Sequence, residues 1–189
     1  MYLLTNKGQS RVEAGFLALV REKSGQPIER CYQCKKCTAG CPVAAHVDWQ
    51  PNQVVRLIQF GQRERVLRST AAWRCLSCET CGERCPNGIH LSEVMDVLRE
   101  LSLESGRPGD RLLSQFHQSF INTLKLTGRQ HEFGMLFAYK MKTLQLFSDL
   151  DIGARMFAKG KLKFMPERIR GMAGINRIFA RARRREVKP

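Results

Sequence analysis

The chain has 189 residues, and its 32 Lys and Arg against 17 Asp and Glu give a formal net charge of +15. This length fits one small cofactor domain with an appendage rather than two full-sized domains. No segment reaches the ~20 apolar residues needed to cross a bilayer, and no basic-then-apolar leader follows Met1. We therefore expect a cytoplasmic protein without a membrane span.

The first predicted element is a helix from Ser10 to Lys23, followed by Gly25 as a stop residue. Its apolar residues are spaced to form one stripe: Val12, Phe16, Leu19 and Val20. We expect residues 1–29 to form an N-terminal helical cap on the region that follows.

All eight cysteines lie in two copies of one spacing, C-x2-C-x2-C-x3-C-P. The first run holds Cys31, Cys34, Cys37 and Cys41, and the second holds Cys75, Cys78, Cys81 and Cys85. Cytosolic thiols stay reduced, so this many cysteines favour metal over disulfides. Structural zinc, the alternative, favours two separated C-x2-C pairs for each ion.

The spacing is typical of bacterial ferredoxins, in which three thiolates of one run and the fourth of the other hold each cluster. It predicts two [4Fe-4S] clusters. Cluster 1 would be held by Cys31, Cys34, Cys37 and Cys85, and cluster 2 by Cys75, Cys78, Cys81 and Cys41. This assignment uses every cysteine and leaves none as a nucleophile. We therefore predict electron transfer without catalysis by this chain.

The two runs belong to a longer repeat with an offset of 44 residues, which also aligns Arg30 with Arg74 and His46 with His90. After the first run, Asp48 is predicted to cap a helix that closes near Gly61, and a shorter helix spans 62–68. After the second run, Ser92 is predicted to cap a helix with an apolar face. Because helices rather than short strands follow the runs, we predict an all-helical dicluster ferredoxin over residues 30–105. A strand is conceivable only at 2–5.

Several other side chains lie near the cysteines in sequence. His46 and His90 could be cluster ligands, but no cysteine is missing, so packing at a helix start or a hydrogen bond near a cluster is favoured. The aromatic residues Trp49, Trp73 and Tyr32 are predicted to shield the clusters from water.

The segment Gly106–Gly109 holds two glycines and a proline and predicts a linker. Residues 106–189 are predicted to form a basic helical extension, since this part holds 18 Lys and Arg against 6 Asp and Glu. Its helices are expected at 110–128, 132–147, about 150–159 and 174–183, the first with an apolar face that includes Phe120 and Ile121. Nucleic acid, an anionic membrane or an acidic protein could meet such a charge. Because the aromatic residues follow helix faces, partner docking is favoured and no nucleic acid is expected.

Both cysteine runs, the helix after Asp48 with its Val-Val-Arg-Leu-Ile segment, Trp73 before Cys75, and the segment Gly160–Pro166 resemble the C subunit of heterodisulfide reductase and its bacterial relatives. The resemblance implies a non-catalytic member of a hetero-oligomer. It would relay electrons between an A subunit, which carries flavin and iron–sulfur clusters, and a B subunit, whose CCG domains act on disulfides or other sulfur substrates.

Other interpretations stay open. The double cysteine run alone also resembles the iron–sulfur subunits of succinate and glycerol-3-phosphate dehydrogenases. A free-standing ferredoxin with a basic tail, or a nucleic-acid-binding iron–sulfur protein, would fit the charge as well.

Overall fold

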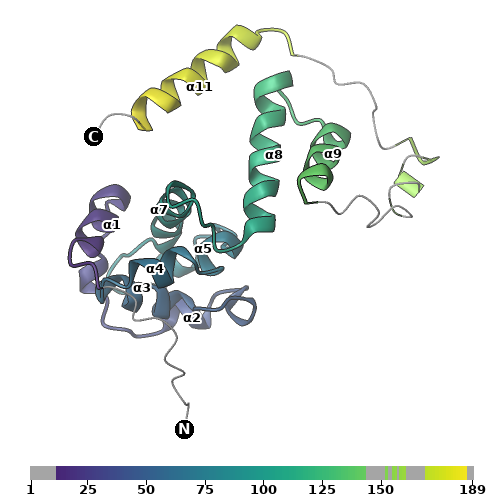
Figure 1. Ribbon diagram of the computed structural model, residues 1–189. Helices are drawn as coiled ribbons and strands as arrows, with labels where there is room; N and C mark the ends of the chain where they lie inside the picture. The colour runs from purple at the N-terminus through teal and green to yellow at the C-terminus, as the bar shows by residue number, and fades with distance from the viewer. Residues whose placement is uncertain (1–11, 144–151, 153–154, 157, 161–168, 187–189) are drawn as a thin grey trace. The chain divides into compact units, whose positions relative to one another are not determined.

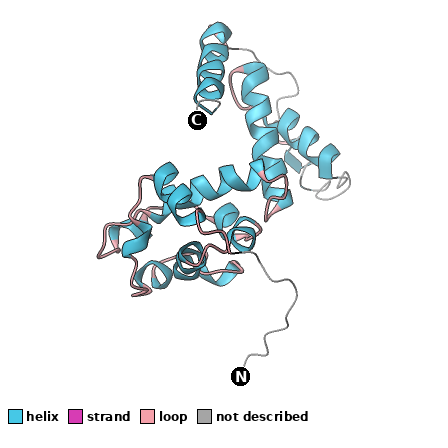
Figure 2. Cartoon of the chain, turned by 60° about the vertical axis from the view of Figure 1, so that its left-hand side comes forward, coloured by secondary structure: helices cyan, strands magenta, loops and turns pink. Residues whose placement is uncertain are grey.

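The computed structural model describes residues 12–143, 152, 155–156, 158–160 and 169–186. Throughout these residues the regular structure is helical and no strand occurs (Figures 1 and 2), which confirms the predicted mainly α fold. The conceivable strand at 2–5 lies outside the described residues. The chain divides into two compact units, Met1–Arg111 and Leu112–Pro189, and each is described by itself.

The first unit contains nine short helices within its described residues. In chain order they are α1 Phe16–Ser24, the 3-10 turn η1 Ile28–Arg30, α2 Lys36–Ala39, η2 Ala44–His46, α3 Pro51–Gln59, α4 Arg63–Leu67, α5 Ala71–Arg74, α6 Thr80–Glu83 and α7 Leu91–Glu104. The 44-residue repeat is visible in this order, because α2 and α6 differ by 44 at both ends.

The core of this unit lies where α1, α3 and α7 pack together. Phe16, Ile58 and Leu98, one from each helix, are at most 1% exposed. Each such side chain contributes about 1.5–3 kcal/mol through its burial. Cys31 and Cys75, the first cysteines of the two runs, pack against this core.

The predicted first helix is confirmed only from Phe16 onward, because residues 12–15 are not helical and Val12, predicted to lie in its apolar stripe, is 68% exposed. Helix α1 ends where Gly25 takes a left-handed φ of 66° and donates its N–H to the Arg21 carbonyl.

Two predicted helix caps are wrong. The N-cap of α3 is Gln50, which forms a reciprocal capping box with Gln53, and the N-cap of α7 is His90. The Asp48 carboxylate instead accepts hydrogen bonds from Ser69 and Thr70, and the hydroxyl of Ser92 donates to Glu79 at 2.7 Å. Contacts between distant segments therefore use the side chains that local capping rules had assigned to the helix starts.

The second unit contains α8 Arg111–Thr127, α9 Glu132–Thr143 and α11 Met172–Glu186. These confirm three predicted helices, whereas most of the one predicted near 150–159, and the basic segment 161–166, lie outside the described residues. The buried residues of α8 are small and polar: Ser114, Ser119, Thr123 and Thr127. Phe120 and Ile121 on its predicted apolar face are 38% and 37% exposed. No helix of the described residues is long and apolar enough to span a bilayer.

Candidate iron–sulfur centres

The two cysteine runs share one unusual backbone path. Gln33 and Lys35 have φ angles of 64° and 64°, and the equivalent Ser77 and Glu79 have 49° and 59°. A left-handed conformation costs a residue other than glycine roughly 1–2 kcal/mol, and such strain is concentrated at functional sites. These residues flank the second cysteine of each run, while α2 and α6 carry the third. The backbone thus winds around each set of thiols in the same way.

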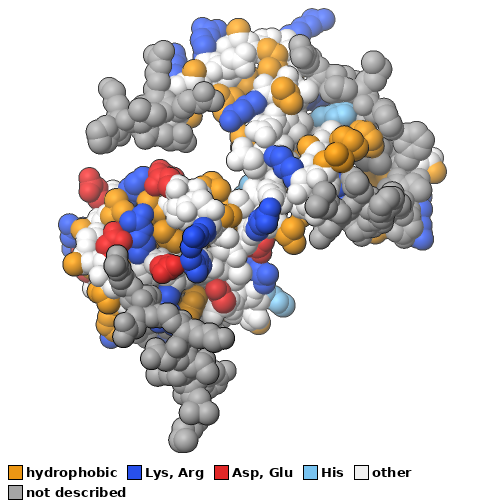
Figure 3. Space-filling view, viewed as in Figure 1, with side chains coloured by type: hydrophobic (Ala, Val, Ile, Leu, Met, Phe, Trp, Pro, Cys, Tyr) orange, Lys and Arg blue, Asp and Glu red, His pale blue; other side chains and the backbone are white. Residues whose placement is uncertain are grey.

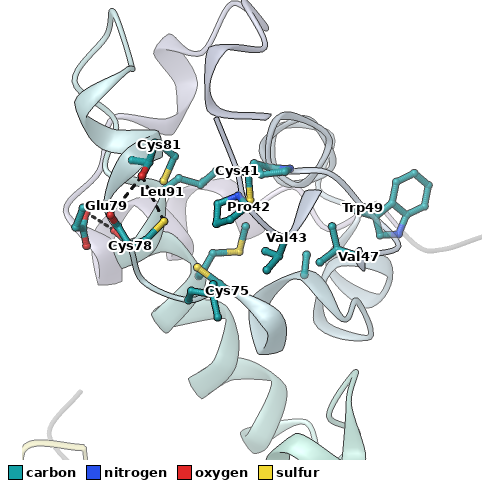
Figure 4. A pocket seen from close by; sticks show the side chains of 16 residues that line it. Cys41, Pro42, Val43, Val47, Trp49, Cys75, Cys78, Glu79, Cys81 and Leu91 are labelled. Atoms are coloured by element: carbon teal, nitrogen blue, oxygen red, sulfur yellow. Dashed lines mark hydrogen bonds between the residues drawn. The ribbon is translucent and has the colours of Figure 1, made fainter. Parts of the chain in front are cut away.

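One cavity brings together four cysteines from both runs. Cys75, Cys78 and Cys81 line it with Cys41 of the first run, as Figure 4 shows. The cavity is partly open to solvent, and most of its other lining residues are apolar: Pro42, Val43, Val47, Trp49, Pro51, Ala71, Leu76, Leu91 and Met95. The structure therefore gathers the four residues predicted to hold cluster 2.

The chemistry of these thiols fits an iron–sulfur cluster. Burial raises the pKa of the Cys75 and Cys81 thiols, while hydrogen bonding with Thr80 lowers the pKa of Cys78. Buried thiolates are costly without a nearby cation, and iron supplies that charge. Among the described residues, no three His, Cys, Asp or Glu side chains converge on a single ion. The thiolates of a cubane surround a four-iron unit and stand farther apart.

The thiols of the first run also lie near one another. Burial is the main cause that raises the pKa of Cys37, with smaller contributions from neighbouring Cys31 and Cys34. Gln33 donates from Nε2 to the Cys31 sulfur at 3.5 Å, and the buried Asn52 holds the Gln33 amide by donating to its Oε1 at 3.1 Å. Three of the four residues predicted to hold cluster 1 are therefore close together.

The loop after Cys85 reaches this first run. Asn87, two residues after Cys85, donates from Nδ2 to the carbonyl of Arg30, the residue before Cys31. At the other junction, Arg74, the residue before Cys75, donates from its side chain to the carbonyl of His46. The end of each run is thus tied to the start of the other.

Two hydrogen-bonded clusters strengthen these connections between the runs. In the first, Asp48 accepts from Ser69 Oγ at 2.8 Å and from the Thr70 N–H at 3.0 Å. In the second, the buried Gln26 accepts from the His90 N–H at 2.8 Å and donates to Glu93 at 2.6 Å. Each hydrogen-bonded cluster joins the segment before one run to the segment after the other. Shared cluster ligation requires this connection.

Residues 30–90 match the family model described as a 4Fe-4S dicluster domain. Residues 30–90 are a 4Fe-4S dicluster domain. Its two cofactors are [4Fe-4S] clusters, as the two cysteine runs predict.

Curated relatives extend the match. The chain is 33% identical over 79 residues to the iron–sulfur C subunit of the CoB–CoM heterodisulfide reductase of Methanopyrus kandleri, covering 42% of this chain and 41% of the relative. It is 36% identical over 95 residues to the second C subunit of the corresponding enzyme of Methanocaldococcus jannaschii, covering 50% of both. It is 34% identical over 103 residues to the C2 subunit of the H2/formate:CoB–CoM heterodisulfide,ferredoxin reductase of Methanococcus maripaludis, covering 53% and 55%. The chain spans about half the length of these relatives, and the resemblance to the C subunit is confirmed over that half.

One side chain of α3 and one of α7 each hold the backbone at the first cysteine of a run. Gln59 of α3 donates to the carbonyls of Ile28 and Cys31, both at 3.1 Å. Arg99 of α7 donates to the equivalent carbonyls of Ala72 and Cys75, both at 2.6 Å. Sequence reasoning missed both residues, because Gln59 and Arg99 do not occupy equivalent positions of the repeat.

The other residues singled out from the sequence have mixed outcomes. Trp73 is 4% exposed and Trp49 lines the cavity of the cluster 2 cysteines, whereas Tyr32 is 63% exposed, so the prediction that Tyr32 is a shield is wrong. His90 lies at the start of α7, and its Nδ1 is 3.7 Å from Glu79 Oε2, in agreement with the packing role favoured for it. His46 is exposed and its carbonyl accepts from Arg74.

Proposed function

We propose that this chain is the electron-transfer member of a cytoplasmic heterodisulfide-reductase-like complex. It relays electrons through its two clusters between an A subunit, which carries flavin and iron–sulfur clusters, and a CCG-domain B subunit, which acts on disulfides or other sulfur substrates. The observation that carries the proposal is the use of cysteine. All eight lie in the two runs of the dicluster domain, so no cysteine is left to attack a substrate.

We assign the ligands across the repeat. For cluster 2, Cys75, Cys78, Cys81 and Cys41 are supported by the cavity that all four line. For cluster 1, Cys31, Cys34, Cys37 and Cys85 are supported by the proximity of the first three and by the contact of Asn87 with Arg30. Each cluster, when bound, accepts and gives up a single electron.

Residues of this chain determine the environment of the two clusters during electron transfer. Trp49 and Leu91 belong to the apolar wall of the cavity that the cluster 2 cysteines line, where Cys78 is exposed and Cys41, Cys75 and Cys81 are half-buried. Gln33 supplies a hydrogen bond to Cys31. Water exclusion and hydrogen bonds to sulfur are the means by which proteins adjust cluster potentials. Gln59 and Arg99 keep the first cysteine of each run in place.

The second unit is proposed to dock partner subunits. Its exposed side chains include Leu126, Phe137 and Ile178, at 67%, 57% and 62% exposure. Figure 3 shows hydrophobic and basic side chains side by side on its described part. Exposed apolar groups with surrounding cations are typical of a protein interface. A +12 excess over residues 106–189 favours acidic partners.

An anaerobic pull-down of the native protein tests the proposal. We expect a flavoprotein and a CCG-domain protein to co-purify with it. A variant with Leu126, Phe137 and Ile178 changed to Ser should keep its clusters but lose both partners, whereas Leu103→Ser, at a 50% exposed site on α7, should keep them. A stable monomer that exchanges electrons with many partners would favour a free-standing ferredoxin. A salt-dependent affinity for nucleic acid without co-purifying subunits would also contradict the proposal.

A further inference from the structure

The two cluster sites share one backbone but differ in charge at one equivalent position. Lys35 follows Cys34, and Glu79 follows Cys78, 44 residues further on. Both have left-handed φ angles, 64° and 59°, and both side chains are exposed. The next equivalent pair is Lys36 and Thr80, so the first run carries two cations where the second carries one anion.

Other charged side chains lie near the second run. Arg74 pairs with Asp110 at 3.5 Å. Arg99 pairs with Asp96 at 2.6 Å, and it also donates to the Cys75 carbonyl, so that its cation lies close to the second site. Glu83 and Arg84, the only other charged residues of the second run, carry opposite charges. The buried Asn52 and its partner Gln33 at the first site are neutral. Within the runs themselves, Lys35 and Lys36 give +2 in the first, and Glu79, Glu83 and Arg84 sum to −1 in the second.

Reduction adds one negative charge to a cluster, and the energy of that charge depends on the groups around it. Cations stabilise the reduced form and anions oppose it. We propose that Lys35 and Glu79 set the order of reduction, so that an electron delivered to this chain rests first on the cluster of the first run. This inference rests on the proposed two-cluster relay and adds a direction to it, because transfer from the second-run site to the first-run site is then downhill.

A substitution can remove the charge of Glu79 and keep its hydrogen bond with Ser92. Its Oε2 accepts from Ser92 Oγ at 2.7 Å and lies 3.7 Å from His90 Nδ1. Glu79 also lines the cavity of the cluster 2 cysteines (Figure 4). Glutamine at this position keeps an acceptor for Ser92. Glutamine is also suited to position 35, since Gln33 already has the same φ of 64°. Glu79→Gln and Lys35→Gln are therefore close to pure charge changes at matched positions.

The test is an anaerobic redox titration of the holoprotein, in which a low-potential chemical reductant supplies the electrons and electron paramagnetic resonance resolves the two clusters. Lys35→Gln should disfavour reduction of the cluster that is reduced first, and Glu79→Gln should favour reduction of the cluster that is reduced second. Each change should be about two- to three-fold in the one-electron equilibrium constant, the effect of one exposed charge about 10 Å away. Glu104→Gln, at a similarly exposed glutamate about 20 Å along α7, should change neither.

The two variants also show which electron paramagnetic resonance signal belongs to which cluster. If Lys35→Gln acts on the cluster that is reduced second, or if neither variant moves either cluster, the inference is wrong while the relay stands. Indistinguishable titrations of the two clusters in the parent protein would overturn it as well. If the parent holds fewer than two clusters, the proposed function itself fails.

Discussion

Replacing Asp48 should destabilise the dicluster domain around cluster 2 and not around cluster 1. Its Oδ1 accepts four hydrogen bonds, from the Trp49 N–H at 2.9 Å, Ser69 Oγ at 2.8 Å, the Thr70 N–H at 3.0 Å and Thr70 Oγ1 at 2.8 Å. Asp48→Ala removes all of them and leaves the hydroxyl of Ser69, which is 2% exposed, without this acceptor. Because Asp48 is exposed, Thr70 is half-buried and water replaces part of the loss, we expect a destabilisation of about 2 kcal/mol.

That cost should appear as faster loss of cluster 2, since Asp48 lies between the end of the first run and the start of the second. If the cluster is lost through local opening, about 2 kcal/mol corresponds to roughly a 30-fold faster loss in anaerobic guanidinium. The loss is followed for each cluster by electron paramagnetic resonance after reduction.

Asp48→Asn is the matched control, because its amide oxygen can take the place of Oδ1 and accept the same hydrogen bonds. Its rate of cluster loss should stay within about three-fold of the parent rate. The reasoning is refuted if Asp48→Ala behaves like Asp48→Asn, or if both clusters are lost together.

Three further predictions address the same domain. Gly61→Ala should lower the free energy of unfolding, measured by anaerobic denaturation, by about 2–3 kcal/mol, because Gly61 has φ of 64° and a Cβ would lie 2.6 Å from the Glu13 carbonyl oxygen. Gly88→Ala, with φ of 62° and open space around the new Cβ, should cost only about 1 kcal/mol, and an equal cost would refute the steric argument. Gln26→Ala removes the hydrogen bonds of Gln26 to His90 and Glu93 and should speed the loss of cluster 1, measured as for Asp48. Preferential loss of cluster 2 would contradict the assignment of ligands to the two clusters. Cys41→Ser should alter the resonance of cluster 2, and a change confined to cluster 1 would refute shared ligation across the repeat.

The helical fold and the repeat could be predicted from the sequence because their signals are local. The apolar spacing of α1 and α7 and the stop at Gly25 depend on neighbours a few residues away. The spacing of the cysteines directly constrains which thiols can reach one cluster. The 44-residue offset then predicts matched structures, and α2 and α6 confirm it.

What the sequence did not reveal depends on contacts between distant segments. Asp48 and Ser92 are good capping residues, but their acceptor and donor groups are used by Thr70 and Glu79. The left-handed conformation of Gln33 is equally hidden, because turn rules predict it for Gly or Asn. In each case a tertiary contact overrides a local preference.

The most direct test of the central claim is the iron and acid-labile sulfide content of the anaerobically purified protein. Two cubanes predict about eight iron and about eight sulfide per chain. About four or fewer of each in a fully loaded sample would contradict a two-cluster relay.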